Sequence, residues 1–176
     1  MPFTIFRPSL VIGEKDGFTG KLRELVTLGP VVPVPGDGNA RFQPIYVEDW
    51  VKCFLKIFSD DLPPPPFIKG GIGGIYEFGG PEQLTYNELA TQLMEEMGIK
   101  KSIIHMPMML AKAGIPFMGI SQKLGGLFGR KIPSVTYEQL TLLGIDNVCD
   151  MNSVENLFGF KPITYREALR RFIKKD

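Results

Sequence analysis

Short apolar segments alternate with amphipathic ones along this chain. The runs PFTIF, residues 2–6, and IYEFGG, residues 75–80, are typical of buried strands bounded by proline or glycine. Between them, residues 18–28 repeat apolar side chains at helical spacing, and Gly29 with Pro30 then ends the helix. The pattern therefore predicts strands that alternate with helices.

The segment VVPVPGDGNARFQPIYVEDW, residues 31–50, predicts a strand, a turn and a second strand that leads directly into a helix over 48–58. Ile45 and Val47 supply the alternating apolar positions of the second strand. Asp49 falls in the first turn of the helix, where the partial positive charge of the helix end stabilises a carboxylate. We therefore expect Asp49 to serve stability.

Three later helices begin with the same motif. In a capping box, a Thr hydroxyl accepts a hydrogen bond from the backbone three residues on, and the Glu or Gln there accepts one in return. The sequence offers this pair at Thr85 and Glu88, Thr136 and Gln139, and Thr164 and Glu167. Between the first two, residues 102–133 are rich in Met and broken by Gly and Pro, which predicts a strand followed by two short helices.

The predicted fold class is α/β, a small mixed domain with short strands and several capped helices. A length of 176 residues fits a single domain over 1–176.

The amino-acid composition limits which partners and which cellular compartments are expected for this protein. Twenty Lys and Arg against 19 Asp and Glu give a net charge of +1, which disfavours a nucleic-acid partner. Two cysteines cannot build a disulfide framework, which indicates a reducing compartment. The sequence contains no run of about 20 apolar residues, which a membrane-spanning helix would need, so we expect a cytoplasmic protein. The single His105 has no metal-ligating neighbour at useful spacing, which predicts no metal site.

Four blocks of sequence, taken together and in order, resemble a known family. They are TIFRPSLVIG (4–13), GDGNARFQPIYVEDWVKCF (36–54), IYEFGGPEQLTYNELATQL (75–93) and LLGIDNVCDMNSVENLFGFKPITYREAL (142–169). They resemble the C-terminal, substrate-side part of an extended or atypical short-chain dehydrogenase/reductase, which has a Rossmann-type fold. The likeness is to the NAD(P)-dependent epimerase/dehydratase branch that includes the nucleotide-binding accessory subunit of respiratory complex I and its bacterial relatives.

Two features of that family are absent from this sequence. The Gly-rich turn that cradles the dinucleotide pyrophosphate has no counterpart, because GGIGG, residues 70–74, lacks its spacing and leads into a strand. The family's acid/base pair, a Tyr with a Lys four residues on, is also missing. The resemblance thus implies a truncated chain without the N-terminal dinucleotide-binding half. We expect no catalytic residue in it and no activity from it alone.

The resemblance also implies where the cofactor lies. Pro8, Ser9 and Leu10 match the segment that the family places beside the nicotinamide ring. They would form one wall of a pocket, so NAD or NADP would bind tightly only to the full-length parent.

Arg41, Phe42 and Gln43 match a segment that lines the family's substrate cleft. The resemblance implies that Arg41 and Gln43 contact a small-molecule substrate, for which a nucleotide sugar is one candidate, and that Phe42 is a stacking or packing surface. The alternative for Arg41 is a solvated turn residue. Because surface substitutions usually change stability by less than roughly half a kcal/mol, we expect changes at Arg41 and Gln43 to affect ligand binding and hardly the melting temperature.

Two functions stay open. The parent is either an NAD(P)-dependent sugar-nucleotide epimerase/dehydratase or related reductase, or a non-catalytic nucleotide-binding assembly subunit. The Met-rich segment 106–118 suits either an adaptable contact with a partner, quinone-like ligand or lipid tail, or an ordinary lid packed on the domain. The strand at 2–6 would present an open edge to the missing half, which predicts self-association of the isolated chain.

Overall fold

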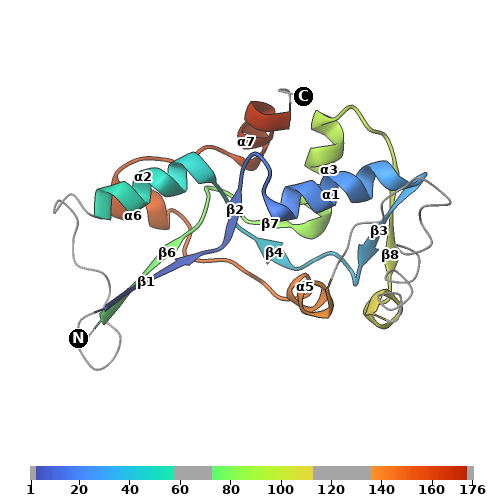
Figure 1. The fold of residues 1–176 in the computed structure, drawn as a ribbon, viewed down its shortest axis with the longest axis horizontal. Helices are drawn as coiled ribbons and strands as arrows, with labels where there is room; N and C mark the ends of the chain where they lie inside the picture. The colour runs from blue at the N-terminus through green and yellow to red at the C-terminus, as the bar shows by residue number, and fades with distance from the viewer. Residues whose placement is uncertain (1–2, 58–72, 113–135, 174–176) are drawn as a thin grey trace. The chain divides into compact units, whose positions relative to one another are not determined.

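The computed structural model describes residues 3–57, 73–112 and 136–173 (Figure 1). Most of the Pro- and Gly-rich stretch at 59–74 lies outside these ranges. So do residues 113–118 of the Met-rich segment and most of the two helices predicted after the strand at 102. The described elements are β1 (Phe3–Pro8), β2 (Leu10–Ile12), α1 (Gly17–Leu28), β3 (Val31–Pro35), β4 (Arg41–Phe42), β5 (Pro44–Tyr46), α2 (Val47–Ile57), β6 (Gly73–Phe78), β7 (Leu84–Thr85), α3 (Tyr86–Glu96), β8 (Ser102–Met106), α5 (Tyr137–Leu142), α6 (Ser153–Phe158) and α7 (Tyr165–Phe172).

Three strand pairs run parallel. β1 pairs with β6 from Phe3 opposite Gly73 to Pro8 opposite Phe78, β2 pairs with β5, and β3 pairs with β8. Parallel strands need a long crossover connection, and at least one helix lies in the sequence between the members of each pair. The predicted α/β class, with short strands and capped helices, is confirmed.

The predicted strand over residues 41–47 is wrong in two respects, because it is two strands separated at Gln43 and because Val47 already belongs to α2. β4 pairs with β7, whereas β5 pairs with β2. Pro44, which has no backbone N–H to donate, opens the second strand. The change of partner leaves Gln43 between two ladders and frees its backbone for other hydrogen bonds.

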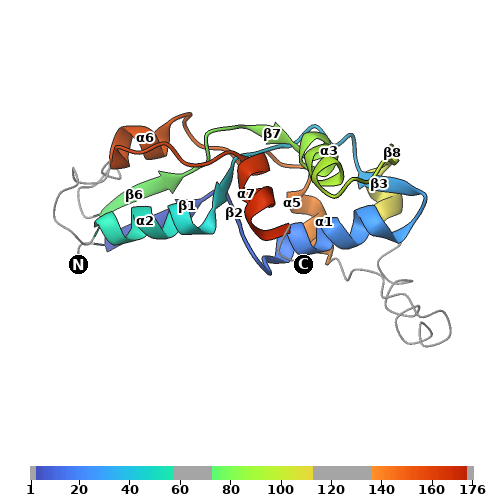
Figure 2. The same ribbon diagram turned by 90° about the horizontal axis from the view of Figure 1, so that it is seen from above.

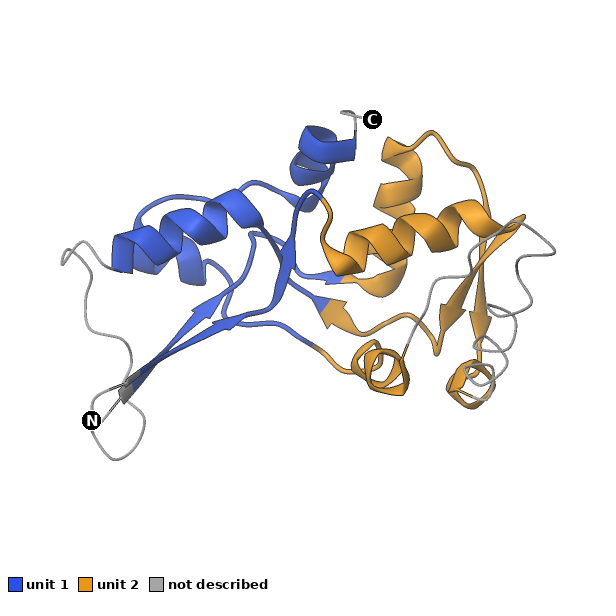
Figure 3. Ribbon diagram, viewed as in Figure 1, with its two compact units in different colours: residues 1–14, 42–84, 147–176 blue, residues 15–41, 85–146 orange. Residues whose placement is uncertain are grey.

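The described residues form two compact units (Figure 3). Unit 1 comprises residues 1–14, 42–84 and 147–176, and unit 2 comprises residues 15–41 and 85–146. Two compact units can belong to one domain, so the single domain expected from the sequence stays a prediction.

Aromatic side chains dominate the core of unit 1. Helices α2 and α6 lie side by side over one face of the β1–β6 pair (Figures 1 and 2). Phe78 stacks on Phe158 at 5.6 Å between ring centroids, and Tyr76 lies 6.2 Å from the same ring. Such aromatic pairs contribute beyond the area that they bury. The buried cluster comprises Ile45, Cys53, Tyr76, Phe78, Val154 and Phe158.

The core of unit 2 is mainly aliphatic. Helix α1 packs on β3 and on α3. Asp16 caps α1 by accepting hydrogen bonds from the backbone N–H groups of Phe18 and Thr19, a cap that the sequence pattern had not singled out. The fully buried side chains here include Leu22, Val26, Val32, Val34, Leu89 and Leu93.

The three predicted capping boxes are confirmed at the starts of α3, α5 and α7. At α3 the Thr85 backbone N–H donates to Glu88, which lowers the pKa of that carboxyl below its usual value. Thr164 and Glu167 make the same arrangement at α7. The signal was reliable because both hydrogen bonds of the box are local in sequence.

Asp49 is buried, although it stands in the first turn of α2. Its carboxylate accepts a hydrogen bond from the backbone N–H of Ile163 at 2.9 Å and pairs with Lys52 at 2.8 Å. Its side chain is 3 % exposed. The residue therefore joins α2 to the segment before α7, a contact between residues far apart in the sequence.

None of the helices in the described ranges is long and apolar enough to cross a membrane.

Removing this carboxylate should destabilise the protein. Asp49→Ala leaves the Ile163 N–H without its acceptor, at a cost of about 1–3 kcal/mol, which lowers the melting temperature by roughly 3–10 °C. Calorimetry of the purified chain measures the change. The control is Glu48→Ala, which removes the neighbouring exposed acid of the same helix turn. Equal melting temperatures for the two variants would contradict the assignment.

The two cysteines should differ sharply in reactivity. Burial raises the pKa of the Cys53 thiol to about 12, and its side chain is fully buried, so its nucleophilic thiolate hardly forms near pH 8. Cys149 is only partly buried. We expect Ellman's reagent to modify Cys149 slowly in the folded chain, and both thiols in denaturant. Cys149→Ser should abolish the reaction of the folded chain, and fast reaction in that variant would contradict the burial of Cys53.

Candidate functional site

Ser9 occupies the bend between β1 and β2, in the segment predicted to face the cofactor. Its backbone N–H donates to the Phe78 carbonyl at 2.9 Å, and its hydroxyl donates to the Asn147 carbonyl. The same hydroxyl accepts the backbone N–H of Gln43 at 3.1 Å, and the Asn147 side chain donates to the Ser9 carbonyl at 2.7 Å. Every polar atom of Ser9 therefore has a partner inside the protein.

Gln43 lies at the centre of a buried hydrogen-bond network, and its relative exposure is 0 %. Its side-chain amide nitrogen donates to the Gly80 carbonyl at 2.9 Å. Its side-chain oxygen accepts the backbone N–H of Cys149 at 3.0 Å and lies 3.5 Å from the Gln83 amide nitrogen. The Cys149 sulfur is also 3.5 Å from that oxygen.

Two glycines make room for this network. A Cβ on Gly79 would come within 2.4 Å of the Gln43 side chain, and a Cβ on Gly80 would come within 1.8 Å of the Pro44 carbonyl oxygen. Real Cβ atoms essentially never come this close to non-bonded atoms, so neither position accepts a larger residue without a shift of its surroundings. The Gly-Gly pair is required by packing against residues 43 and 44.

Arg41 forms a two-pronged ion pair with Asp146 in unit 2. Its Nη2 and Nε lie 2.8 and 3.0 Å from one Asp146 oxygen, and its backbone N–H donates to the other oxygen at 2.8 Å. The hydrogen bonds from the Arg41 backbone and guanidinium lower the pKa of the Asp146 carboxyl. Both side chains remain about half exposed, at 51 % and 43 %. The guanidinium is thus oriented but still accessible.

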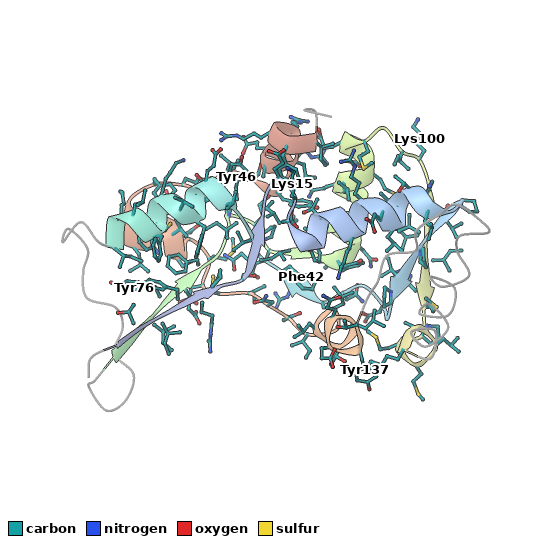
Figure 4. The ribbon with its side chains drawn as sticks, in the orientation of Figure 1. Lys15, Phe42, Tyr46, Tyr76, Lys100 and Tyr137 are labelled. Atoms are coloured by element: carbon teal, nitrogen blue, oxygen red, sulfur yellow. The ribbon has the colours of Figure 1, made fainter. Side chains whose placement is uncertain are left out.

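The structure brings some of the predicted residues together. Ser9 and Gln43 are in direct contact within unit 1, and Pro8 and Leu10 flank Ser9 with partly exposed side chains. Phe42, labelled in Figure 4, is 5 % exposed and lies on β4. The expectation that Gln43 is a surface position is wrong, because the residue is fully buried. The direct roles in ligand binding stay predictions.

Sequence reasoning missed the residues that complete the network. Asn147 and Cys149 lie more than 100 residues from their partners Ser9 and Gln43. The only available signal was the run IDNVCD inside a block that resembles the family. No spacing rule connects such distant positions.

Unit 2 carries a separate open hollow of about 600 Å³. Its wall includes His105, whose Nε2 lies 3.1 Å from the Asn87 side-chain oxygen. The Asn87 amide nitrogen donates to the Asp37 carbonyl, which makes the imidazole the donor to the Asn87 oxygen. In the described ranges, no group of three metal-ligating side chains that could hold an ion is found. The hollow is lined by Gly36, Asp37, Asn39, Asn87, His105 and Pro107.

Comparison by sequence finds relatives of two kinds, although no family model matches the chain. Subunit 9 of the NADH dehydrogenase [ubiquinone] 1 alpha subcomplex, mitochondrial, from Arabidopsis thaliana is 30 % identical over 110 residues, which are 62 % of this chain and 26 % of that protein. The 3beta-hydroxysteroid-dehydrogenase/decarboxylase isoform 1 of the same plant is 25 % identical over 171 residues, or 95 % of this chain and 38 % of that protein. The chain thus spans well under half of either relative.

Solved structures share the fold at lower identity. UDP-glucuronic acid 4-epimerase from Bacillus cereus, in complex with NAD, matches 99 % of this chain and 45 % of its own chain, with a TM-score of 0.59 and 15 % identity. The dTDP-glucose 4,6-dehydratase from Bacillus anthracis, also in complex with NAD, matches 97 % of this chain and 43 % of its own, with a TM-score of 0.57 and 17 % identity. The Rossmann-type fold predicted from the sequence is therefore confirmed, and so is the resemblance of this chain to the extended short-chain dehydrogenase/reductases, with the complex I accessory subunit among its relatives.

Proposed function

We propose that this chain is the substrate-side portion of an NAD(P)-dependent epimerase/dehydratase or related reductase, and that it is inactive alone. The observation that carries the proposal is the extent of the match. Nearly the whole chain aligns with a dehydrogenase/decarboxylase, yet it covers only 38 % of that relative. The missing phosphate cradle and Tyr-Lys pair fit the same picture.

The bend at Pro8, Ser9 and Leu10 is the proposed wall for a nicotinamide ring. Because the polar atoms of Ser9 are engaged within the protein, the bend fits a ring as a fixed, mainly apolar surface. A bound dinucleotide would supply the hydride chemistry. The contribution of this chain would be to hold the wall in place and exclude water from it.

Arg41 is the proposed substrate contact. Its guanidinium is half exposed and is already oriented by Asp146, so little side-chain entropy remains to be lost on binding. An oriented guanidinium suits the phosphates of a nucleotide sugar, which it can bind through two parallel hydrogen bonds. Phe42 and Gln43 are buried, which favours support of this segment over direct contact with substrate.

A second function is favoured by a different observation. The accessory subunit of NADH dehydrogenase is 30 % identical to this chain in Arabidopsis thaliana and 26 % identical, over 92 residues, in Dictyostelium discoideum. We infer that the parent could instead be a nucleotide-binding assembly subunit without turnover. Reading the coding sequence upstream of Met1 separates the two functions, because an enzyme needs both a Gly-rich fingerprint and a Tyr-Lys pair.

Cytoplasmic location and self-association through the edge of β1 stay predictions.

The first test asks whether the chain alone has activity. Purified chain mixed with NAD or NADP and a panel of nucleotide sugars should change neither the absorbance of the reduced nicotinamide nor the chromatographic profile of the sugars. The physical reason is that the chain lacks both the pyrophosphate cradle and the proton-transferring pair. The chromatography is needed because an epimerase or dehydratase returns the hydride to the sugar and leaves no net change in absorbance. Sustained turnover by the isolated chain would refute the proposal.

The second test concerns Arg41 in the full-length parent. Arg41→Ala should weaken nucleotide-sugar binding roughly tenfold or more, because hydrogen bonds to charged groups contribute about 1.5–3 kcal/mol. Its melting temperature should hardly change, since exposed ion pairs contribute about 0–1 kcal/mol. Titration calorimetry and thermal melts measure both quantities. Arg171→Ala, which removes an Arg from a similarly exposed pair with Glu48, is the control. If Arg41→Ala lowered the melting temperature but left nucleotide-sugar binding unchanged, the result would contradict a ligand role and support the alternative of a structural turn residue.

A further inference from the structure

We propose that Gln43 is a positioning residue, which fixes the cofactor-facing bend at Ser9 through the segment of residues 147–149. The proposal rests on the proposed function of the bend as a cofactor wall. It assigns the buried side chain of Gln43 a role that acts through other residues and requires no contact with substrate.

The first step is the fixation of residues 147–149. The Gln43 side-chain oxygen accepts the Cys149 backbone N–H at 3.0 Å, and the side-chain nitrogen is held by the Gly80 carbonyl at 2.9 Å. Both atoms are therefore used, and the amide has one orientation that satisfies them. Rotating the amide by a half turn would place its nitrogen against the Cys149 N–H and its oxygen against the Gly80 carbonyl.

The second step is the clamp on Ser9. Asn147, two residues before Cys149, receives the Ser9 hydroxyl at its carbonyl and donates its side-chain nitrogen to the Ser9 carbonyl at 2.7 Å. The Gln43 backbone N–H holds the same hydroxyl from the other side at 3.1 Å. Ser9 is thus held between two segments, and the side chain of Gln43 connects one of them to the other.

The third step is burial. Gln43 is 0 % exposed, so its amide has no water to replace a lost partner. A Cβ on Gly79 would come within 2.4 Å of the amide, so the amide is packed closely against this glycine. The network therefore has a single arrangement, as a positioning device requires.

The decisive variant is Gln43→Glu. A protonated carboxyl has nearly the shape of the amide, can donate to the Gly80 carbonyl and can accept from Cys149. Burial should raise the pKa of this introduced carboxyl in the folded state well above its unfolded value of about 4.3. Stability is then fully present below about pH 4.3 and is lost as the pH rises through the higher folded pKa.

Melting temperatures of the chain, measured from pH 4 to pH 8, test this directly. The difference between Gln43→Glu and the wild type should be small at pH 4 and on the order of 10 °C at pH 8. Gln92→Glu makes the same chemical change at a partly exposed glutamine of α3, outside this network, and should show a much smaller dependence. A constant difference across the pH range would overturn the predicted hydrogen-bond roles of the Gln43 amide.

Positioning, as distinct from stability, is read at Ser9 and Cys149. In Gln43→Ala, the backbone amide signals of Ser9 and Leu10 should shift in an ¹H–¹⁵N spectrum, and Cys149 should react with Ellman's reagent about tenfold faster. Asp49→Ala, which lowers stability from outside this network, should produce neither change. Unchanged Ser9 and Leu10 signals in folded Gln43→Ala would overturn the proposal. None of these readouts requires cofactor, so a failure to bind NAD would count against the proposed function alone.

Discussion

A buried amide that has lost its water must find all its hydrogen bonds within the protein, and Gln43 imposes this constraint on unit 1. The sequence pattern predicts one strand from 41 to 47, but the strand is interrupted at Gln43. This residue takes part in a side-chain hydrogen-bond network and lies between two β-ladders. The same constraint explains the glycine at position 79, whose Cβ would meet the Gln43 amide, whereas Gly80 is required by the Pro44 carbonyl. Residues from four distant parts of the chain are thereby fixed to one another.

Asp49 acts by the same physics a few residues later. Its carboxylate is withdrawn from water and satisfied by the Ile163 N–H and the Lys52 ammonium. One short stretch, from β4 into α2, therefore contains two buried polar groups, each bonded to a segment more than 100 residues away. Between them, Ile45 packs into the aromatic core of unit 1. The stretch holds the C-terminal region in place as well as forming its own secondary structure.

The functional reading follows from which polar groups are buried and which are accessible. The polar atoms of Gln43 and Ser9 form hydrogen bonds within the protein, which makes the bend at Ser9 a rigid surface. Arg41 retains about half of its exposure while Asp146 orients it, which supports the proposal that Arg41 contacts an anionic ligand. This contrast distinguishes the proposed supporting residue, Gln43, from the proposed ligand contact, Arg41, a distinction that the family resemblance alone does not make.

The sequence by itself determined the features whose physics is local. The α/β alternation and the three capping boxes were predictable from residues within a few positions of each other. So were a strand, predicted at 2–6 and found at 3–8, and a helix, predicted at 18–28 and found at 17–28. The order of four sequence blocks also determined the family likeness. Only the tertiary structure decided the partner of Asp49, the burial of Gln43 and the pairing of Arg41 with Asp146, since each depends on residues 105 to 114 positions apart. A hydrogen bond across that separation leaves no periodic trace in the sequence, because the fold and not the spacing brings its donor to its acceptor.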